Sequence, residues 1–315
     1  MAYVIRRILI TIPVLFAITV LVFGIMYLAP GSPLDLLLDP TVTTEQLELQ
    51  RQALGIDQPF YVQYTRWLTE LFKGNLGYSY QSSRPVLEMI GARLPATLLL
   101  STAATVLAYG LAVPMGVLAG RRPYSLWDYG ALGLAFVTTA TPAFFLGLIG
   151  IYVFAVRLGW LPVGHMVPPG GQLTLGSLLH HLTLPALVLA AGQIGGILRY
   201  VRAGVLETLH QDYVRTARAK GLSEQRVVYK HVLRNSLIPL VTHFGLSLPL
   251  FVGGAIVIEQ VFVWPGIGTL MMRAISGRDY PVIMGVTLLV SVAVLLGNLL
   301  TDLAYGWLDP RIRYG

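Results

Sequence analysis

The sequence predicts an all-α membrane protein that crosses the bilayer six times. Only 12% of its 315 residues are charged and 55% are hydrophobic, whereas soluble domains carry about 25% charged residues. The apolar residues also form six stretches of roughly the 20 residues that a membrane-spanning helix needs. These expected spans cover residues 8–28, 96–119, 130–156, 182–198, 237–258 and 281–300. The absence of cysteine excludes disulfides, thiolate metal sites and cysteine nucleophiles.

The first expected span follows Arg6-Arg7 and therefore resembles the start of a signal peptide. Its apolar run is too long for a signal peptide, and no clear small-residue cleavage site follows Leu28, so we interpret it as an uncleaved helix. The fourth span is the shortest, and its glycines are typical of close helix packing. Prolines inside the spans predict kinks. These prolines are Pro13, Pro114, Pro142, Pro185 and Pro249.

The distribution of Lys and Arg gives the orientation. Residues 199–234 contain eight basic and three acidic residues, whereas residues 30–95 contain five basic and seven acidic ones. The positive-inside rule then places residues 199–234 and both termini in the cytoplasm, and residues 30–95 outside. The basic excess borders the inner leaflet. No basic soluble domain remains that would bind nucleic acid, so membrane lipid is the expected polyanionic partner.

The external segment is too long to be a simple turn. Residues 44–55 predict a helix that Thr44 caps and Gly55 ends. Residues 58–72 carry an amphipathic stripe of Tyr61, Tyr64 and Trp67 with two leucines. Such aromatic residues suit a membrane interface. Two compatible hypotheses follow: a helix lying on the outer leaflet, and a docking platform for an external delivery protein.

A polar block separates the fourth and fifth spans. Residues 212–220 predict a short helix ended by Gly221, and Ser223 is placed to cap a second helix with Glu224 in its first turn. One hypothesis is a surface for a cytoplasmic partner, in which the small side chains of Ala217 and Ala219 allow close approach. The other is a solvated basic loop that only enforces the topology.

The block resembles the cytoplasmic coupling loop of permease subunits of binding-protein-dependent ABC importers, in the dipeptide, oligopeptide and nickel branch. The family pattern is Glu-Ala-Ala, three residues and Gly. Here Arg215-Thr216-Ala217 occupies the first three places and Gly221 is the glycine. The runs Arg-Thr-Ala-Arg-Ala-Lys-Gly and, at residues 233–235, Leu-Arg-Asn are similar to that branch. A contact credited to the family's glutamate has no counterpart at Arg215.

Further matches follow in order along nearly the whole chain. They are Gly31-Ser32-Pro33, Leu54-Gly55-Ile56-Asp57-Gln58-Pro59, Gly74-Asn75-Leu76-Gly77, Trp264-Pro265-Gly266-Ile267-Gly268, Arg278-Asp279-Tyr280-Pro281 and Asp309-Pro310-Arg311-Ile312-Arg313. The resemblance implies a type I ABC importer permease in a prokaryotic plasma membrane. It divides the chain into an N-terminal helix (1–29), an external segment (30–95), a transmembrane domain (96–306) with its coupling loop (199–236), and a cytoplasmic tail (307–315).

The resemblance also implies partners and a function. Two related permeases pair, two cytoplasmic ATPases bind the coupling loops, and an external binding protein delivers the substrate. The expected cargo is a di- or oligopeptide, with nickel or another small solute as the alternative. The implied ATPase-coupling residues are Arg215, Thr216, Ala217, Arg218, Ala219, Lys220 and Gly221. The chain has no GxxxxGK[ST] phosphate loop, so we expect ATP and Mg²⁺ on partner subunits and no cofactor here.

Several polar residues in or near the spans are further candidates. Glu259, together with Trp264, Pro265 and Gly266, is a candidate gate or path element. Structural roles, such as pairing with an arginine or capping a helix, are the alternative for Glu259 and for Asp302.

The histidines have structural interpretations as well. We interpret His243 as a hydrogen-bonded interior group. The pair His180-His181 is either an interfacial polar step or a transient nickel site, and we assign no metal site.

Two other function classes are weaker. An intramembrane hydrolase needs a nucleophile and base, or paired acids, inside the spans, and the sequence contains no such set. A stand-alone secondary transporter is favoured by inverted repeats, and the chain has no convincing internal repeat. The chain is therefore expected to be a transport subunit rather than an enzyme.

Overall fold

A computed structural model describes residues 2–28, 55, 57–168, 170–236, 240, 244–245, 251 and 255–308. The regular secondary structure of these residues is helical, apart from one isolated bridge between Tyr78 and Pro85. The helices are α1 (Ala2–Leu28), α3 (Phe60–Phe72), α4 (Val86–Arg121), α5 (Leu126–Ala140), α6 (Ala143–Gly150), η2 (Ile151–Arg157), α7 (Leu175–Leu209), α8 (Asp212–Ala219), α9 (Glu224–Arg226), η3 (Val227–Val232), α10 (Leu233–Ser236), α13 (Ile256–Val261), α14 (Ile267–Ser276) and α15 (Tyr280–Leu308).

Four helices in the described residues are long and apolar enough to cross a membrane: α1, α4, α7 and α15. A fifth crossing is possible if the helical run from Leu126 to Arg157 counts as one broken span, because its halves are bent by 103°. The break lies at Thr141-Pro142, where Thr141 is extended and proline has no N–H to continue the helix. The predicted kink at Pro142 is therefore confirmed. The expected span 237–258 lies mostly outside the described residues.

The helices α4 and α7 extend well beyond the spans predicted at 96–119 and 182–198, to 36 and 35 residues. They cross along a seam of small residues, because a Cβ on Gly116 or Gly120 would come within 2.8 Å of Val201 or Val205. Ala104, Ala108 and Ala112 are fully buried in the same seam. Close packing of two backbones at small residues is the usual way in which membrane helices associate.

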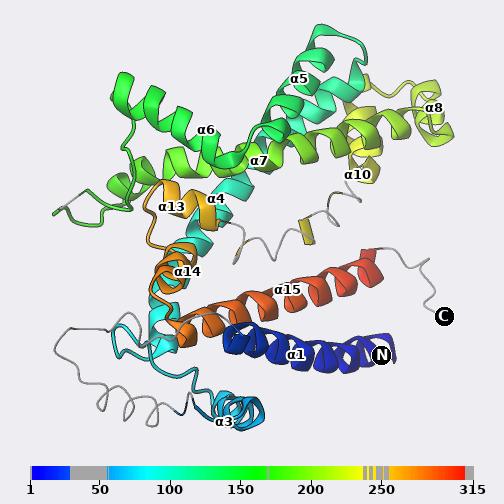
Figure 1. Ribbon diagram of the computed structural model, residues 1–315. Coiled ribbons are helices and arrows are strands. Elements are labelled where there is room, and N and C mark those ends of the chain that lie inside the picture. Colours follow the sequence, from blue (N-terminus) through cyan, green and yellow to red (C-terminus); the bar gives the residue numbers. More distant parts are fainter. Residues whose placement is uncertain are drawn as a thin grey trace.

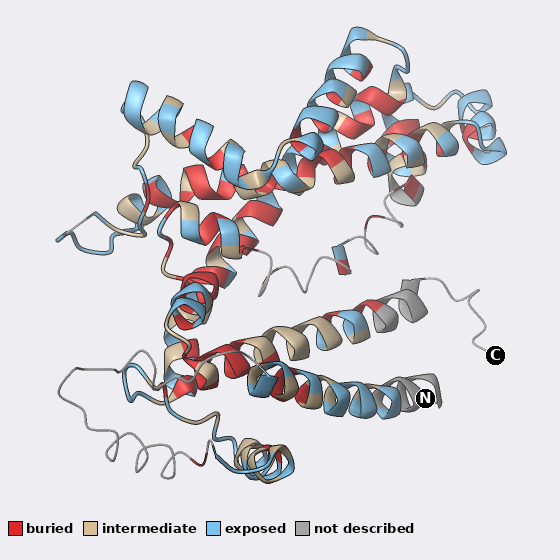
Figure 2. Ribbon diagram, in the orientation of Figure 1, coloured by how far each residue is buried: buried red, intermediate tan, exposed pale blue. Residues whose placement is uncertain are grey.

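The helices α1 and α15 lie side by side and form a second layer (Figure 1). The start of α1 and the end of α15 lie at the same end of the molecule as α8, whereas α3 and α14 lie toward the opposite end (Figure 1). Buried residues concentrate where α4 crosses α7 and around α13 and α14, while α1, α5 and α6 expose much of their apolar surface (Figure 2). We refer below to the α8 end and the α14 end.

The predicted aromatic helix is present as α3, and its stripe packs on α1. Tyr64 is buried, its hydroxyl lies 2.9 Å from Oγ1 of Thr19, and Phe60 and Trp67 contact the ring of Phe23. Tyr64 therefore faces α1, whereas Tyr61 of the same stripe is exposed. The two hypotheses for this helix, a position on the outer leaflet and a docking platform, stay predictions. The expected helix over 44–55 lies outside the described residues except for Gly55, whose φ of 66° fits a helix-ending glycine.

Candidate functional site

The short helix α8 presents one buried side and one exposed side. Val214 and Ala217 are buried in a cluster with the valines of η3 and with Val205 of α7. The other side chains of α8 and Lys220 point away from this core. They are Asp212, Tyr213, Arg215, Thr216, Arg218, Ala219 and Lys220. The helix α8 therefore presents a charged, exposed face to the outside and packs its other face on buried valines.

One expectation for α8 is wrong. Ala217 is only 5% exposed and packs inside the chain, so its small size serves that packing and not the approach of a partner. Ala219, two residues later, lies on the exposed side as expected. The difference follows from helical geometry, because positions 214 and 217 are three residues apart and share a face.

Gly221 ends α8 in the left-handed conformation that the sequence predicted, with a φ of 76°. Its N–H donates to the carbonyl of Arg218 at 2.9 Å, which closes the last turn. A Cβ at this position would meet no atom within 4 Å. The need for glycine is therefore conformational and not steric.

An ion pair that the sequence analysis missed connects α8 to the next helix. The guanidinium of Arg218 donates to both carboxylate oxygens of Glu224, at 2.8 and 3.2 Å. This hydrogen bonding lowers the pKa of Glu224 below its ordinary value. Ser223, expected to cap the second helix, makes no side-chain capping bond. The pairing of residues six apart across a turn follows from the positive-φ glycine between them.

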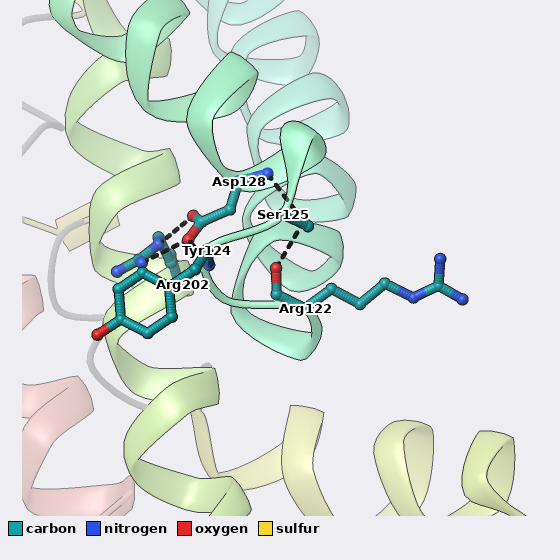
Figure 3. Close-up of polar contacts among 5 residues, drawn as sticks. All are labelled: Arg122, Tyr124, Ser125, Asp128 and Arg202. Carbon is teal, nitrogen blue, oxygen red and sulfur yellow. Dashed lines mark hydrogen bonds and ion pairs between the residues drawn. The ribbon is translucent and has the colours of Figure 1, made fainter.

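A second missed pair joins α5 to α7 (Figure 3). Arg202 of α7 donates through Nε and Nη2 to Oδ1 and Oδ2 of Asp128, at 2.5 and 2.7 Å. Asp128 is 1% exposed, and it also accepts from the backbone N–H of Tyr124 at 2.8 Å. Ser125 caps α5 by accepting from the N–H of Asp128. The ion pair thus ties the first turn of α5 to α7 seven residues before α7 ends.

The sequence did contain a signal for this pair. Ser125 followed three residues later by Asp128 is similar to a capping box at a helix start, and an arginine on an apolar helix needs a counter-charge. Both the serine–aspartate spacing and an arginine on an apolar helix are common in sequences, so neither one alone predicts the pair. Only the packing of α5 on α7 brings the two residues together.

At the α14 end, Glu259 is completely buried and acts as a helix cap. Its Oε2 accepts from the N–H groups of Gly268 at 2.7 Å and Thr269 at 3.3 Å, and its Oε1 accepts from Oγ1 of Thr97 at 2.6 Å. These N–H groups belong to the first turn of α14, which attracts negative charge. Of the roles considered for Glu259, the geometry is that of capping. The side chain of Asp302 and all of His243 lie outside the described residues.

The three neighbours predicted with Glu259 lie in the same place. Trp264 is completely buried and donates from Nε1 to the carbonyl of Ala96 at 2.8 Å. Gly266 precedes α14, and a Cβ there would overlap the Glu259 carboxylate. Pro265 borders a cavity at this end. The structure thus brings the candidate gate set together around the start of α14, far from α8 (Figure 1).

The histidine pair anchors the loop before α7. Nδ1 of His181 lies 2.9 Å from the carbonyl oxygen of Gly164, and Nε2 of His180 lies 2.9 Å from that of Trp160. In the described part of the chain, no group of three His, Cys, Asp or Glu side chains could hold a metal ion. These contacts agree with the interpretation of the pair as a polar step at the helix end.

Comparison with known proteins covers the chain from end to end. Residues 112–314 match the family described as "Binding-protein-dependent transport system inner membrane component", and residues 1–101 match the N-terminal family of such membrane components. The oligopeptide transport system permease protein AppB of Bacillus subtilis is 47% identical, with 99% of each chain covered. The glutathione transport system permease protein GsiC of Escherichia coli is 41% identical, with 99% of each covered. The di/tripeptide transport system permease protein DppB of Pseudomonas aeruginosa is 39% identical, covering 100% of this chain and 99% of that protein.

Solved structures give the fold. An inward-facing structure of the methionine ABC transporter MetNI aligns with a TM-score of 0.56 at 18% identity, covering 71% of this chain and 97% of that chain. An amino acid ABC transporter aligns with a TM-score of 0.51 over 70% of this chain and 95% of that chain, at 16% identity. The chain therefore belongs to the family of binding-protein-dependent transport system inner membrane components, as a multi-pass permease subunit of an ABC importer whose separate ATPase subunits hydrolyse ATP.

Proposed function

We propose that this chain forms half of the membrane path of an importer for di- or oligopeptides. The other half is a second, related permease, and an external binding protein delivers the peptide. The printed names of the relatives, which cover oligopeptides, di- and tripeptides and glutathione, support a peptide cargo. We further propose six spans, the fifth formed within residues 237–258, with both termini and α8 in the cytoplasm. We also propose an N-terminal helix (1–29), an external segment (30–95), a transmembrane domain (96–306) with its coupling loop (199–236), and a cytoplasmic tail (307–315).

The observation that carries the proposal is the construction of α8. Its buried side chains, Val214 and Ala217, join the same hydrophobic core as the crossing of α4 and α7. A force applied to the exposed side of α8 is therefore transmitted to the two longest described helices. We propose that the exposed residues of this segment contact the ATPases: Arg215, Thr216, Arg218, Ala219 and Lys220. In this proposal Ala217 anchors α8 from its buried side and Gly221 sets the turn. The ATPases hold the ATP and Mg²⁺, and this chain binds no cofactor. Closure of the ATPases then moves α8 and switches the path between inward-open and outward-open.

The α14 end is the proposed external side. Glu259, Trp264 and Gly266 fix the start of α14 against α4 there, so we propose that this unit moves as one body when the path opens. The binding protein approaches at this end. Membrane lipid covers the remaining apolar surface, and we assign no nucleic-acid partner.

The test is substrate-dependent ATP hydrolysis by the reconstituted importer, with this chain, its companion permease, both ATPases and the binding protein. A dipeptide, a longer peptide and a nickel chelate are each tested with and without the binding protein. The proposal predicts stimulation only by peptide-loaded binding protein. Stimulation by the nickel chelate but by neither peptide would show that the cargo is nickel. Failure of the ATPases to copurify with this chain would favour a stand-alone transporter.

A further inference from the structure

A cavity of about 560 Å³ opens at the α14 end, between the outer part of α4, α14 and the loop before α4. Three arginines line it: Arg84 from the loop, Arg93 from α4 and Arg273 from α14. Its remaining walls include flexible apolar side chains such as Met89 and Met166. Cavities of this size hold small ligands, and methionine adapts to varied partners.

Within the described ranges, the three positive charges have no carboxylate of their own. Among the described residues, no acidic side chain forms an ion pair with Arg84, Arg93 or Arg273. Arg93 is half-buried, whereas Arg84 and Arg273 are exposed at the border of the same cavity. The cavity therefore gathers three cations on its lining.

The two acids nearby are already engaged. Asp279 accepts from the hydroxyl of Ser79 at 2.5 Å and from the backbone N–H of Tyr80 at 3.0 Å. Both oxygens of Glu259 accept hydrogen bonds, one from Thr97 and the other from the start of α14. These carboxylates hold the walls together, and the excess positive charge remains.

Arg93 is half-buried near the start of α4, in the segment assigned to the external side, and a partly buried cation is costly unless it faces water or a ligand. Guanidinium groups bind carboxylates through paired hydrogen bonds, which are stronger than those between neutral groups. We propose that this cavity binds the free carboxylate of the transported peptide at the entrance to the path, with Arg93 and Arg273 as its ligands. This inference rests on the proposed peptide import. The same charge would repel a bare divalent cation.

The test compares a peptide with a free C-terminal carboxylate and the same peptide as its C-terminal amide. Substrate-stimulated ATPase activity of the complete importer is measured for the wild type, Arg93→Gln, Arg273→Gln and, as a matched control at an exposed position just after α4, Arg122→Gln. Because the binding protein is identical in every arm, its own preference cancels when the acid-to-amide ratio of KM values is compared between permeases. We expect the wild type and Arg122→Gln to share one ratio favouring the acid, and each cavity variant to reduce that preference on the order of tenfold.

Retained stimulation by the amide shows that a variant is folded and assembled. An unchanged acid-to-amide ratio in both folded variants would overturn the carboxylate site while leaving peptide import intact. A wild type that no peptide stimulates would overturn both proposals. The assay is repeated in zwitterionic lipid with and without phosphatidylglycerol, and variants that change both peptides equally, and only with the anionic lipid, would show a lipid phosphate site instead.

Discussion

The two ends of the molecule neutralise a buried carboxylate in different ways. At the α8 end, Asp128 is paired with the full positive charge of Arg202. At the α14 end, no cation in the described part of the chain forms an ion pair with Glu259, which is held by a hydroxyl and the first N–H groups of α14. The first arrangement joins two long helices by their side chains. The second joins a side chain to the backbone of a short helix, so the position of α14 depends directly on that one carboxylate.

Asp128→Ala removes the acidic partner of the ion pair at the α8 end. The change leaves the largely buried guanidinium of Arg202 without its partner, which typically costs about 3–5 kcal/mol. We expect this variant to lower the thermal stability of the whole purified importer, because it separates α5 from α7. The double change Asp128→Ala with Arg202→Leu should recover part of the loss, and a double variant less stable than the single one would show that the pair is not the cause.

The matching change at the other end is Glu259→Ala. It leaves two N–H groups of α14 and the hydroxyl of Thr97 without an acceptor, at a cost of about 1–3 kcal/mol for each unsatisfied group. Here we expect a local effect, with faster hydrogen exchange at Gly268 and Thr269 and little change around α7. Exchange that rises equally across α7 would contradict the separation of the two ends.

A smaller loss of stability is expected from a change in the turn that ends α8. Gly221→Val forces a β-branched residue into the left-handed region, at a cost of about 1–2 kcal/mol. Because no atom would contact the new Cβ, the core should survive while α8 is reoriented. We predict an assembled importer with peptide-stimulated transport lost and basal ATP hydrolysis retained. Gly159→Val, also at positive φ and open space but outside α8, is the matched control. Normal transport by Gly221→Val would remove the coupling role of this turn.

The smallest effect is the pH dependence of the Arg218–Glu224 pair. The pKa of Glu224 is lowered by Arg218, so the stability it contributes is fully present above the ordinary value of 4.5 and is lost as pH falls through the lowered folded pKa. Both side chains are about half exposed, so the contribution is below about 1 kcal/mol. Between pH 6 and roughly pH 3, exchange protection of the residue 220–224 turn should fall in the wild type and stay flat in Glu224→Gln. Equal falls in both would assign the effect elsewhere.

The residues that the sequence predicted well are those with a local signal. Gly221 stands after a short polar helix, and the apolar runs of α1, α4, α7 and α15 need only their length. The long-range pairs were not predicted, because Asp128 and Arg202 are 74 residues apart and Thr97 and Glu259 are 162 apart. Ala217 was misplaced for a related reason: its face of α8 is decided by η3 and α7, which the local pattern does not reveal.

The proposed coupling role of α8 requires that its exposed side faces the cytoplasm and contacts an ATPase subunit. The chain has no cysteine, so single changes at two alanines of the same helix provide a direct test. Ala219 is exposed and Ala217 is buried, so the two test variants are Ala219→Cys and Ala217→Cys. In the assembled importer, we predict that a short bifunctional thiol cross-linker joins position 219, but not position 217, to an engineered cysteine on the facing ATPase surface. Labelling of position 219 in intact cells by a membrane-impermeant maleimide, with no cross-link to the ATPase, would contradict the account.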